Sequence, residues 1–535
     1  MSRSRLAAIA LAMVAALAFA ALGLRDIGAA SGPSTKGAHL ASDRGEGKPA
    51  PAAQKRPNVV FILTDDLDKS LMPYMPNTTR LIRDQGADFT NFYVEQSSCC
   101  PSRASILSGD YAHNHGVIGN TWPEGGYDRW KQTKQDDDLA VWLSKAGYRN
   151  AMLGKYFNEY PYHPGSHLSE TRKARLREYV PPGWHSWASP VQGNAYAQDH
   201  YKLNVDGHVD HDFHTDYLDS WLGQRALDLV DGSDGFDFAD GGQFIYYASY
   251  SPHTPYAYPR SLAGTFTDAR YPRTPDFDEA DTSDKFGLAR QRALLTHHDV
   301  RTIDRTFRDR IRSVQTLDET VAKLVQALAD QHALDNTYII FTSDNGYHMG
   351  NHRREIGKYT QFQNDVAVPF YIRGPGIEPG STIADVAGNI DIAPTIAQIA
   401  GARTPEVDGL SLLPRLHGGP PLQRKYYLIG RALTPSNATS ANGLEEPTDP
   451  NSEPDRSSEL NDFTGVTNGR YKLVRYTHLP HEELYDLNKD PFELHNLLAD
   501  DAASYAAMTP AGRRAVDTLR AALDQLVDCA GVTCQ

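Results

Sequence analysis

Basic residues are in short supply in this sequence. The 53 Lys and Arg residues are outnumbered by 67 Asp and Glu, and the formal net charge is -14. Nucleic-acid-binding proteins are more often basic, so we expect no nucleic-acid partner. Any anion-binding pocket must therefore be built locally from basic side chains, against an unfavourable average field.

Long apolar runs are also scarce. The stretch from Leu6 to about Leu24 is the one segment nearly long enough to span a bilayer. It follows Arg3 and Arg5 and is rich in small residues, which is typical of a secretory signal peptide. We predict a signal peptide over 1–30, no stable membrane span after processing, and a secreted or extracytoplasmic protein. An uncleaved N-terminal anchor is the alternative. A disordered leader is expected over 31–56.

Cysteine is rare, with four residues in two close pairs. Cys529 and Cys534, near the C-terminus, can form a short-loop disulfide in an oxidising compartment. The alternative is two free surface thiols. Cys99 and Cys100 are adjacent, which is poor geometry for an ordinary structural bridge.

Internal repeats are absent, and strand-like runs alternate with helical patterns from Pro57 onward. This alternation predicts the α/β class, with a large mixed, mainly parallel sheet flanked by helices. The expected strands end near 64, 155, 248 and 343, and the expected helices cover 139–147 and 312–332.

The pattern changes after Gly401, so we predict a large domain over 57–401 and a smaller α+β domain over 402–535. The smaller domain is expected to carry an antiparallel sheet, because Val466–Tyr476 has the pattern of a hairpin with an Asn-Gly turn. A strand at 483–487 and a helix at 513–527 complete it. A surface insertion is expected over 433–462.

Chemically active side chains follow the predicted strands. Ligands of parallel sheets bind beyond the carboxyl ends of the strands, so we expect these residues to converge. They are Asp65, Asp66, Lys155, His253, Asp344 and Asn345. Carboxylate and amide oxygens suit Ca²⁺ or Mg²⁺ rather than zinc. Taken singly, each acidic site is more typical of a helix cap or a turn than of a metal site. Two such sites, each at the end of an apolar strand, favour a divalent cation.

Two lysines and a histidine supply the positive side of this hypothetical site. Lys155 and Lys358 can hold anionic oxygens, and His253 can act as a general acid. The plain alternatives are solvated lysines and a histidine that stiffens a proline-rich loop. Residues 101–107, just after Cys99, can open a helix whose N-terminal amides favour an anion.

Several motifs carry a family resemblance. Cys99, Pro101 and Arg103 form a C-x-P-x-R pattern within Ser98–Gly109, and His113-Asn114-His115 follow. Further matching segments are Gly154–Tyr160, Tyr179–Trp184 and Ser343–His348. With these motifs the chain resembles the formylglycine-dependent sulfatases of the alkaline-phosphatase superfamily, and within them most closely the N-acetylglucosamine-6-sulfatases, including the extracellular heparan-sulfate endosulfatases.

The resemblance implies roles for individual residues. Cys99 would be oxidised to Cα-formylglycine by a formylglycine-generating enzyme. Asp65, Asp66, Asp344 and Asn345 would bind Ca²⁺ together with the modified Cys99, with Mg²⁺ the less favoured ion. Arg103, Lys155, His253 and Lys358 would bind sulfate and transfer protons, with Asn158 a further substrate contact. Phe157 replaces a histidine that many arylsulfatases use to expel sulfate, which leaves His348 and His253 as candidates for that step.

The implied function is a sulfuric ester hydrolase acting on a sulfated sugar, with 6-O-sulfated N-acetylglucosamine preferred, through a formylglycine-sulfate intermediate. The long basic insertion typical of the endosulfatases is not apparent, which favours exo action or a small substrate. Alternatives are an arylsulfatase, a phosphonate monoester or phosphodiester hydrolase on the same scaffold, and a non-catalytic sulfoglycan-binding protein with unmodified Cys99.

Overall fold

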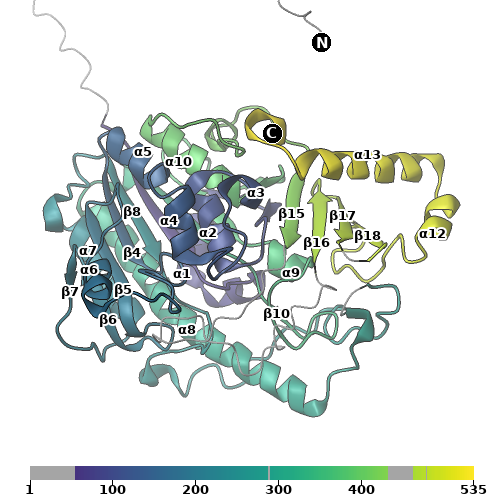
Figure 1. The fold of residues 1–535 in the computed structure, drawn as a ribbon, viewed down its shortest axis with the longest axis horizontal. Helices are drawn as coiled ribbons and strands as arrows, with labels where there is room; N and C mark the ends of the chain where they lie inside the picture. The colour runs from purple at the N-terminus through teal and green to yellow at the C-terminus, as the bar shows by residue number, and fades with distance from the viewer. Residues whose placement is uncertain (1–54, 287–288, 432–461, 478) are drawn as a thin grey trace, which may run out of the picture. The chain divides into compact units, whose positions relative to one another are not determined.

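A ten-stranded mixed sheet forms the centre of the computed structural model, which describes residues 55–286, 289–431, 462–477 and 479–535 (Figure 1). In spatial order the strands are β13 (Ser381–Ile383), β2 (Ala87–Phe89), β12 (Phe370–Arg373), β9 (Thr337–Ser343), β1 (Asn58–Thr64), β8 (Gln243–Ala248), β4 (Arg149–Gly154), β5 (Ser186–Asn194), β6 (Asp199–Val205) and β7 (His208–Val209). The central run from β9 to β5 is parallel, and antiparallel strands adjoin it on both sides. The predicted fold class is confirmed.

Strand β1 illustrates why the centre of the sheet is so apolar. Every residue of Asn58–Thr64 is buried. Val59 and Phe61 belong to one hydrophobic core, whereas Val60 and Ile62 belong to another. Successive side chains of a strand point to opposite faces, so a strand covered on both faces needs a continuous apolar run.

Different helices cover the two faces. Residues of α2 (Cys99–Ser108), α4 (Gly126–Thr133), α5 (Leu139–Lys145) and α10 (Ile392–Ala400) share one core with the sheet. Residues of α7 (Leu218–Val230) and α8 (His297–Asp330) share the other. The predicted start of the helix over 312–332 was wrong. This helix, α8, begins at His297, after a capping box formed by Thr296 and Asp299.

A second sheet lies in the C-terminal part of the chain. It is antiparallel and contains β15 (Tyr427–Arg431), β16 (Phe463–Thr467), β17 (Tyr471–Tyr476) and β18 (Glu482–Asp486). Helix α13 (Pro510–Leu526) shares a hydrophobic core with it. Gly469 has φ +82° in the turn between β16 and β17, as the Asn-Gly pattern predicts. Residues from Lys55 onward form one contact unit, and the division near residue 401 stays a prediction.

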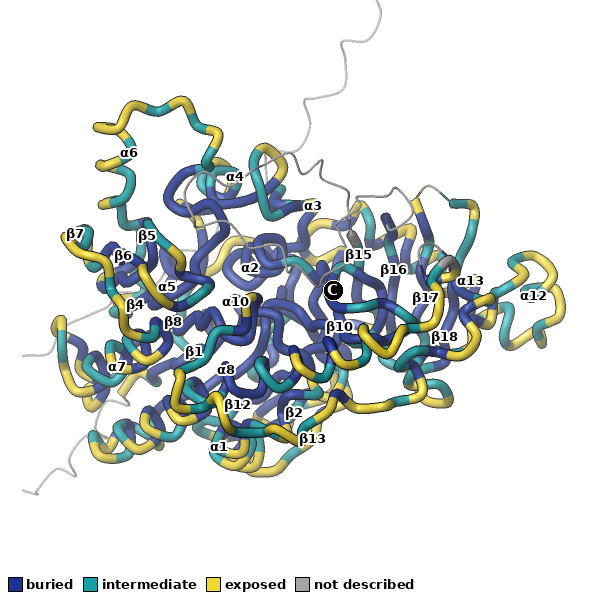
Figure 2. Tube along the Cα trace, turned by 90° about the horizontal axis from the view of Figure 1, so that it is seen from below, coloured by how far each residue is buried: buried dark blue, intermediate teal, exposed yellow. Residues whose placement is uncertain are grey.

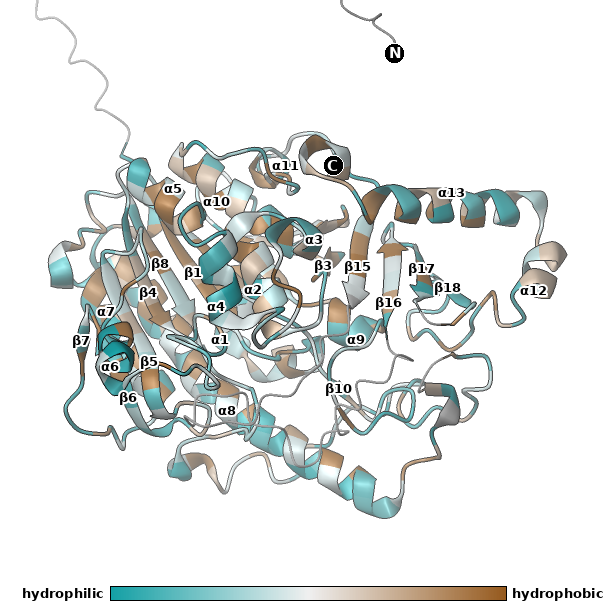
Figure 3. Cartoon of the chain, in the orientation of Figure 1, coloured by the Kyte–Doolittle hydropathy of each residue, from teal (hydrophilic) through white to brown (hydrophobic). Residues whose placement is uncertain are grey.

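The remaining elements are short. They include α1 (Pro76–Thr78), β3 (Phe92–Tyr93), α3 (Ala112–His115), α6 (Glu170–Arg177), β10 (His348–Met349), β11 (Ile356–Gly357), α9 (Gln363–Val366), β14 (Ala387–Gly388), α11 (Leu413–Leu416) and α12 (Ala502–Ala507). Figure 2 shows many exposed residues around α6 and α12, and Figure 3 shows α6 as strongly hydrophilic.

Three predictions fall largely outside the described residues: the signal peptide, the leader up to residue 54 and the insertion up to residue 461. Within the described ranges, no helix combines the length and apolar character needed to cross a bilayer.

Candidate functional site

The carboxyl ends of neighbouring parallel strands place the predicted residues at one edge of the large sheet. Asp65 and Asp66 directly follow β1, and Asp344 and Asn345 directly follow β9, its neighbour. On the other side, β8 leads into the loop of His253, and β4 leads into Lys155. All six side chains are buried.

Helix α2 brings Cys99 to this edge. Ser98 is extended and Cys99 is the first helical residue, while Gly109, at φ 77°, ends the helix. Pro101 is tolerated there because amides of the first turn have no intrahelical acceptor. The amide of Cys100 donates instead to Oδ1 of Asn120, at 2.9 Å. The buried Cys99 side chain therefore lies at the positive end of a helix dipole.

Four potential ligands cluster tightly around this cysteine. One ligand atom from each of Asp65, Asp66, Cys99 and His253 lies within 4.8 Å of the other three. The Cys99 sulfur is 3.4 Å from Oδ1 of Asp65. Nζ of Lys358 is 2.9 Å from that sulfur and 2.8 Å from Oδ1 of Asp66.

Two further cations balance the carboxylates. Lys155 donates to Oδ2 of Asp65 at 2.6 Å, and Nε of Arg103 donates to Oδ2 of Asp344 at 2.9 Å. Burial opposes ionisation of Asp65, but the charge of Lys155, with smaller contributions from His253 and Arg103, holds its pKa well below the usual range. Burial raises the pKa of Asp344 to about 6, and the charge of Asp65 acts in the same direction. Asp65 is thus the firmly ionised centre of the cluster.

His253 has a defined orientation. Its Nδ1 lies 2.8 Å from the carbonyl oxygen of Thr254, which can only accept, so we assign the neutral-ring proton to Nδ1. Nε2 lies 3.5 Å from Oδ2 of Asp66. The ring of Tyr196 is 4.7 Å from the imidazole, centroid to centroid. Nε2 is therefore the ring nitrogen on the side of Asp66.

The donor set fits a hard divalent cation. Asn345 donates from Nδ2 to Oδ1 of Asp66 at 2.7 Å. Its Oδ1 is buried and has no hydrogen-bond partner among the described residues. An unpartnered amide oxygen is costly to bury, and beside three carboxylates it offers the oxygen-rich environment that Ca²⁺ or Mg²⁺ takes.

Two of the remaining candidates lie outside the four-ligand group. Asn158 is buried, and its backbone N–H donates to the sulfur of Cys100, not Cys99, at 3.2 Å. His348 places Nδ1 3.0 Å from both oxygens of Asp365, and its buried Nε2 has no hydrogen bond within the described chain. Phe157 stacks on Trp130 with ring centroids 5.0 Å apart, in the hydrophobic core.

Sequence reasoning missed Arg310, a fully buried residue of α8. Its guanidinium donates to the carbonyl oxygen of Asp66 at 2.7 Å and to Oδ1 of Asp68 at 2.8 Å. Asp66 adopts φ +66°, and this contact helps to hold that left-handed backbone. Its spacing in the sequence could have revealed that it is buried, because Arg310 falls on the same helix face as Phe307 and Val314.

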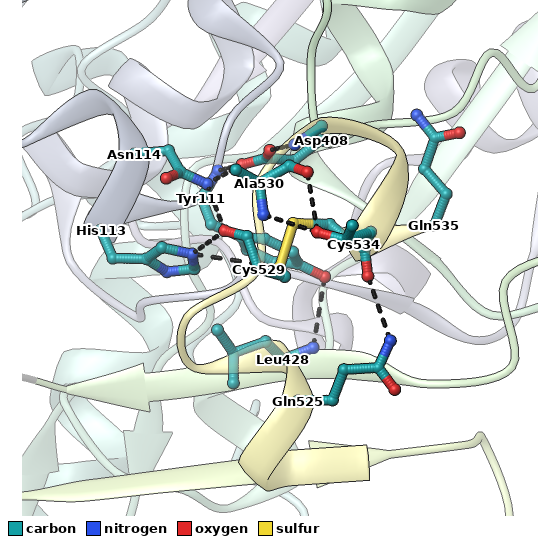
Figure 4. Close-up of a disulfide and its surroundings, with 12 residues drawn as sticks. Tyr111, His113, Asn114, Asp408, Leu428, Gln525, Cys529, Ala530, Cys534 and Gln535 are labelled. Atoms are coloured by element: carbon teal, nitrogen blue, oxygen red, sulfur yellow. Dashed lines mark hydrogen bonds between the residues drawn. A yellow bond between two sulfur atoms is a disulfide. The ribbon is translucent and has the colours of Figure 1, made fainter. Parts of the chain in front are cut away.

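Cys529 and Cys534 are joined by a disulfide near the C-terminus (Figure 4). The carbonyl oxygen of Cys529 lies 2.9 Å from Nε2 of His113 and accepts a hydrogen bond from Asn114 at 2.9 Å. The backbone of Cys529 therefore contacts α3, the helix that follows α2.

Comparisons with known proteins identify the family of the chain. The sulfatase family model matches residues 57–402. The N-acetylglucosamine-6-sulfatase of Homo sapiens is 32% identical over 507 residues, covering 90% of this chain and 87% of that protein.

Solved structures share the fold. One, in complex with its substrate D-glucosamine-2-N,6-O-disulfate, matches with a TM-score of 0.67 at 22% identity, over 89% of this chain and 99% of that one. The phosphonate monoester hydrolase of Agrobacterium radiobacter matches with a TM-score of 0.63 at 21% identity, over 87% and 96%. These structures show the fold, whereas the family model and the human relative establish that the chain belongs to the sulfatase family and is a sulfuric ester hydrolase.

Proposed function

We propose that this protein removes the 6-O-sulfate group from N-acetylglucosamine residues of a sulfated sugar. The observation that carries the mechanism is the position of Cys99, with its sulfur 3.4 Å from Asp65 and 2.9 Å from Nζ of Lys358. The human N-acetylglucosamine-6-sulfatase, similar over most of the chain, supports the sugar and the position of the ester.

Two groups would complete the site. The unpartnered oxygen of Asn345 supports a Ca²⁺ ion held by Asp65, Asp66, Asp344, Asn345 and the modified Cys99. Bound Ca²⁺ would neutralise the carboxylates and polarise oxygen atoms near residue 99. A site with several protein oxygens suits Ca²⁺ better than Mg²⁺, because Mg²⁺ usually keeps several of its bound waters. A formylglycine-generating enzyme would convert Cys99 to Cα-formylglycine, supplying the hydrated aldehyde that accepts sulfate.

The chain's own cations would stabilise the transferring sulfate. Lys155 donates a hydrogen bond to Asp65, and Lys358 donates one to Asp66. Ammonium groups held in a buried site stabilise developing anionic charge more strongly than they do in water. Arg103, bonded to Asp344 and to the carbonyl oxygen of Lys155, keeps the strand ends together and balances their charge.

His253 would protonate the leaving sugar alcohol. Its Nδ1 is engaged by Thr254, so Nε2 is the atom that delivers the proton. Once neutral, His253 can take a proton back when sulfate is released. We favour it over His348 for this step because His253 belongs to the four-ligand cluster, whereas His348 is bonded to Asp365.

Replacement of each adjacent cysteine tests the mechanism. Cys99→Ala should lower turnover of every sulfate ester by at least about a thousandfold, as expected for loss of a nucleophile. Cys100→Ser is the matched control: it keeps an acceptor for the backbone N–H of Asn158 and should retain turnover within about threefold. Mass analysis of the mature protein should find the aldehyde at residue 99 alone. Full activity of Cys99→Ala would refute the proposal.

A substrate panel tests the specificity. Sulfated N-acetylglucosamines carrying the ester at different hydroxyl groups, an aryl sulfate and an aryl phosphodiester should be compared by kcat/KM. We expect the 6-O-sulfate to exceed its positional isomers by at least about tenfold. A faster aryl phosphodiester reaction would instead favour a phosphodiester hydrolase on this scaffold.

The predicted signal peptide and the Cys529–Cys534 disulfide support export to an oxidising compartment. N-terminal sequencing of protein recovered outside the cytoplasm would test this: a terminus near residue 20 or 30 is expected, and an intact Met1 would contradict cleavage.

A further inference from the structure

Helix α6 is a basic element on an acidic protein. Its eight residues include Arg172, Lys173, Arg175 and Arg177, although the whole chain has a net charge of -14. None of its residues is buried, and it stands away from the neighbouring elements in Figure 2. A helix this short and polar gains little stability from core packing. Packing therefore does not explain why four of its eight residues are basic.

The basic side chains of α6 differ in how they are engaged. Lys173 pairs with Glu170 at 2.9 Å. Arg177 donates to the hydroxyl of Tyr162 at 2.8 Å and lies over its ring. Arg172 and Arg175 are exposed and have no ion pair within the described ranges. These two guanidinium groups are thus available to an external anion.

The contact with Tyr162 connects α6 to the active-site edge of the sheet. Tyr162 lies seven residues after Lys155, and the intervening stretch is buried. An extended chain of that length spans at most about 25 Å. A polymer with one end beside Lys155 can therefore reach α6.

We propose that α6 binds the sulfate groups of a sulfated polysaccharide whose terminal sugar occupies the active site. The proposal rests on the proposed function for the sugar in that site. Guanidinium groups form paired hydrogen bonds with such oxyanions, and a local basic patch offsets the repulsion between an acidic protein and a polyanion. The enzyme would then attack one end of the polymer while α6 holds the following residues.

The test compares two double variants with equal loss of charge. Arg172→Ala/Arg175→Ala removes the two unpaired guanidinium groups. Lys489→Ala/Arg514→Ala removes two exposed charges. Lys489 follows β18 and Arg514 belongs to α13, and both elements lie far from α6 in Figure 1 and Figure 2. The α6 variant should raise KM for a sulfated oligosaccharide about fivefold at low salt, without changing kcat or the kinetics of the monosaccharide sulfate. The control should behave as wild type.

A binding assay separates this proposal from the proposed function. On the inactive Cys99→Ala background, the α6 variant should elute from a heparin column at lower salt than the control variant. This readout holds whichever sulfate ester the enzyme cleaves. Equal elution of the two double variants, or equal effects on oligosaccharide and monosaccharide kinetics, would overturn the proposal. So would retention on DNA as strong as on heparin, because that identifies general adsorption of polyanions.

Discussion

At the scale of single residues, the orientation of His253 determines what its replacement should do. The Nδ1 contact with Thr254 leaves Nε2 facing the cluster at Asp66. A proton donor matters most when the departing alkoxide is a strong base and matters little for a good leaving group. The effect of its removal should therefore depend on the substrate.

His253→Ala should lower kcat for a sugar sulfate by about a hundredfold or more and kcat for nitrophenyl sulfate by less than about tenfold. Steady-state kinetics on both substrates measures the difference. His417→Ala, which removes a histidine bonded to Tyr338 elsewhere in the fold, is the control and should leave both rates near wild type. Equal losses on the two substrates would assign His253 to sulfate binding instead.

Glu95 is a buried carboxyl group that the proposed reaction does not use. It accepts a hydrogen bond from the amide of Ala112 at 2.8 Å. Burial raises its pKa from 4.5 to about 8 despite this hydrogen bond. Between these values the folded protein holds a proton that the unfolded chain releases, so Glu95 makes the protein less stable as pH rises from about 5 to 8.

Glu95→Gln should remove this contribution. The free energy of unfolding of the variant relative to wild type should rise by about 1 to 3 kcal/mol between pH 5 and pH 8. Denaturant unfolding at both values measures it, with Glu124→Gln, at an exposed glutamate, as the control. A constant difference between variant and wild type across this range would show that Glu95 stays ionised in the folded state.

At the scale of elements, the C-terminal sheet supports the segment that carries Lys358. Lys472 of β17 donates to the carbonyl oxygen of Gln361 at 2.5 Å. The side chain of Gln361 donates to the hydroxyl of Tyr476 at 2.9 Å and to Glu483 at 3.0 Å. Because these contacts are buried and polar, the position of the segment depends on strands more than a hundred residues away in sequence.

Tyr476→Phe should loosen this support without leaving a cavity. The variant loses one hydrogen bond to Gln361 and one to Glu483, and we expect kcat to fall about threefold with a smaller change in KM. Tyr505→Phe is the matched control, because its hydroxyl bonds to Asp517 at the surface. A pure loss of stability with unchanged kcat would show that the segment keeps its position without Tyr476.

The apolar pattern of an element determined whether the element could be predicted from the sequence. Strands β1 and β9 were recognisable because burial on both faces demands continuous apolar runs. The first half of α8 was not, because its buried side includes Thr302, Thr306 and Arg310. Polar residues on the inner face hide the 3.6-residue period of the apolar ones.

At the scale of the whole molecule, the site was predictable where strand order places residues and not where distant segments meet. Asp65 and Asp344 follow adjacent strands, so topology brings them together. Asn120, which binds the Cys100 amide, comes from a loop with no strand-end or motif signal. Such a partner emerges only from the tertiary fold.

The last residues of the chain make a second long-range contact, away from the cluster around Cys99. Within the loop closed by the disulfide, the amide of Gly531 donates to Oδ1 of Asp408 at 2.7 Å, and after the loop Gln535 donates to the carbonyl oxygen of Val407 at 3.1 Å. These bonds join Gly531 and Gln535 to the segment that follows α10.

Cys529→Ser/Cys534→Ser should therefore weaken the fold and spare the chemistry. Closing a loop between cysteines 5 residues apart is worth about 2 kcal/mol in the chain-entropy description, so the thermal midpoint should fall by a few degrees while kcat at 25 °C stays within about twofold. Reducing agent should lower the midpoint of wild type similarly and leave the double variant unchanged, because the variant has no bond to reduce. A large fall in kcat in the folded variant would instead show that the position of Cys99 in α2 depends on the disulfide. The contact of Cys529 with His113 in α3 would then transmit this effect.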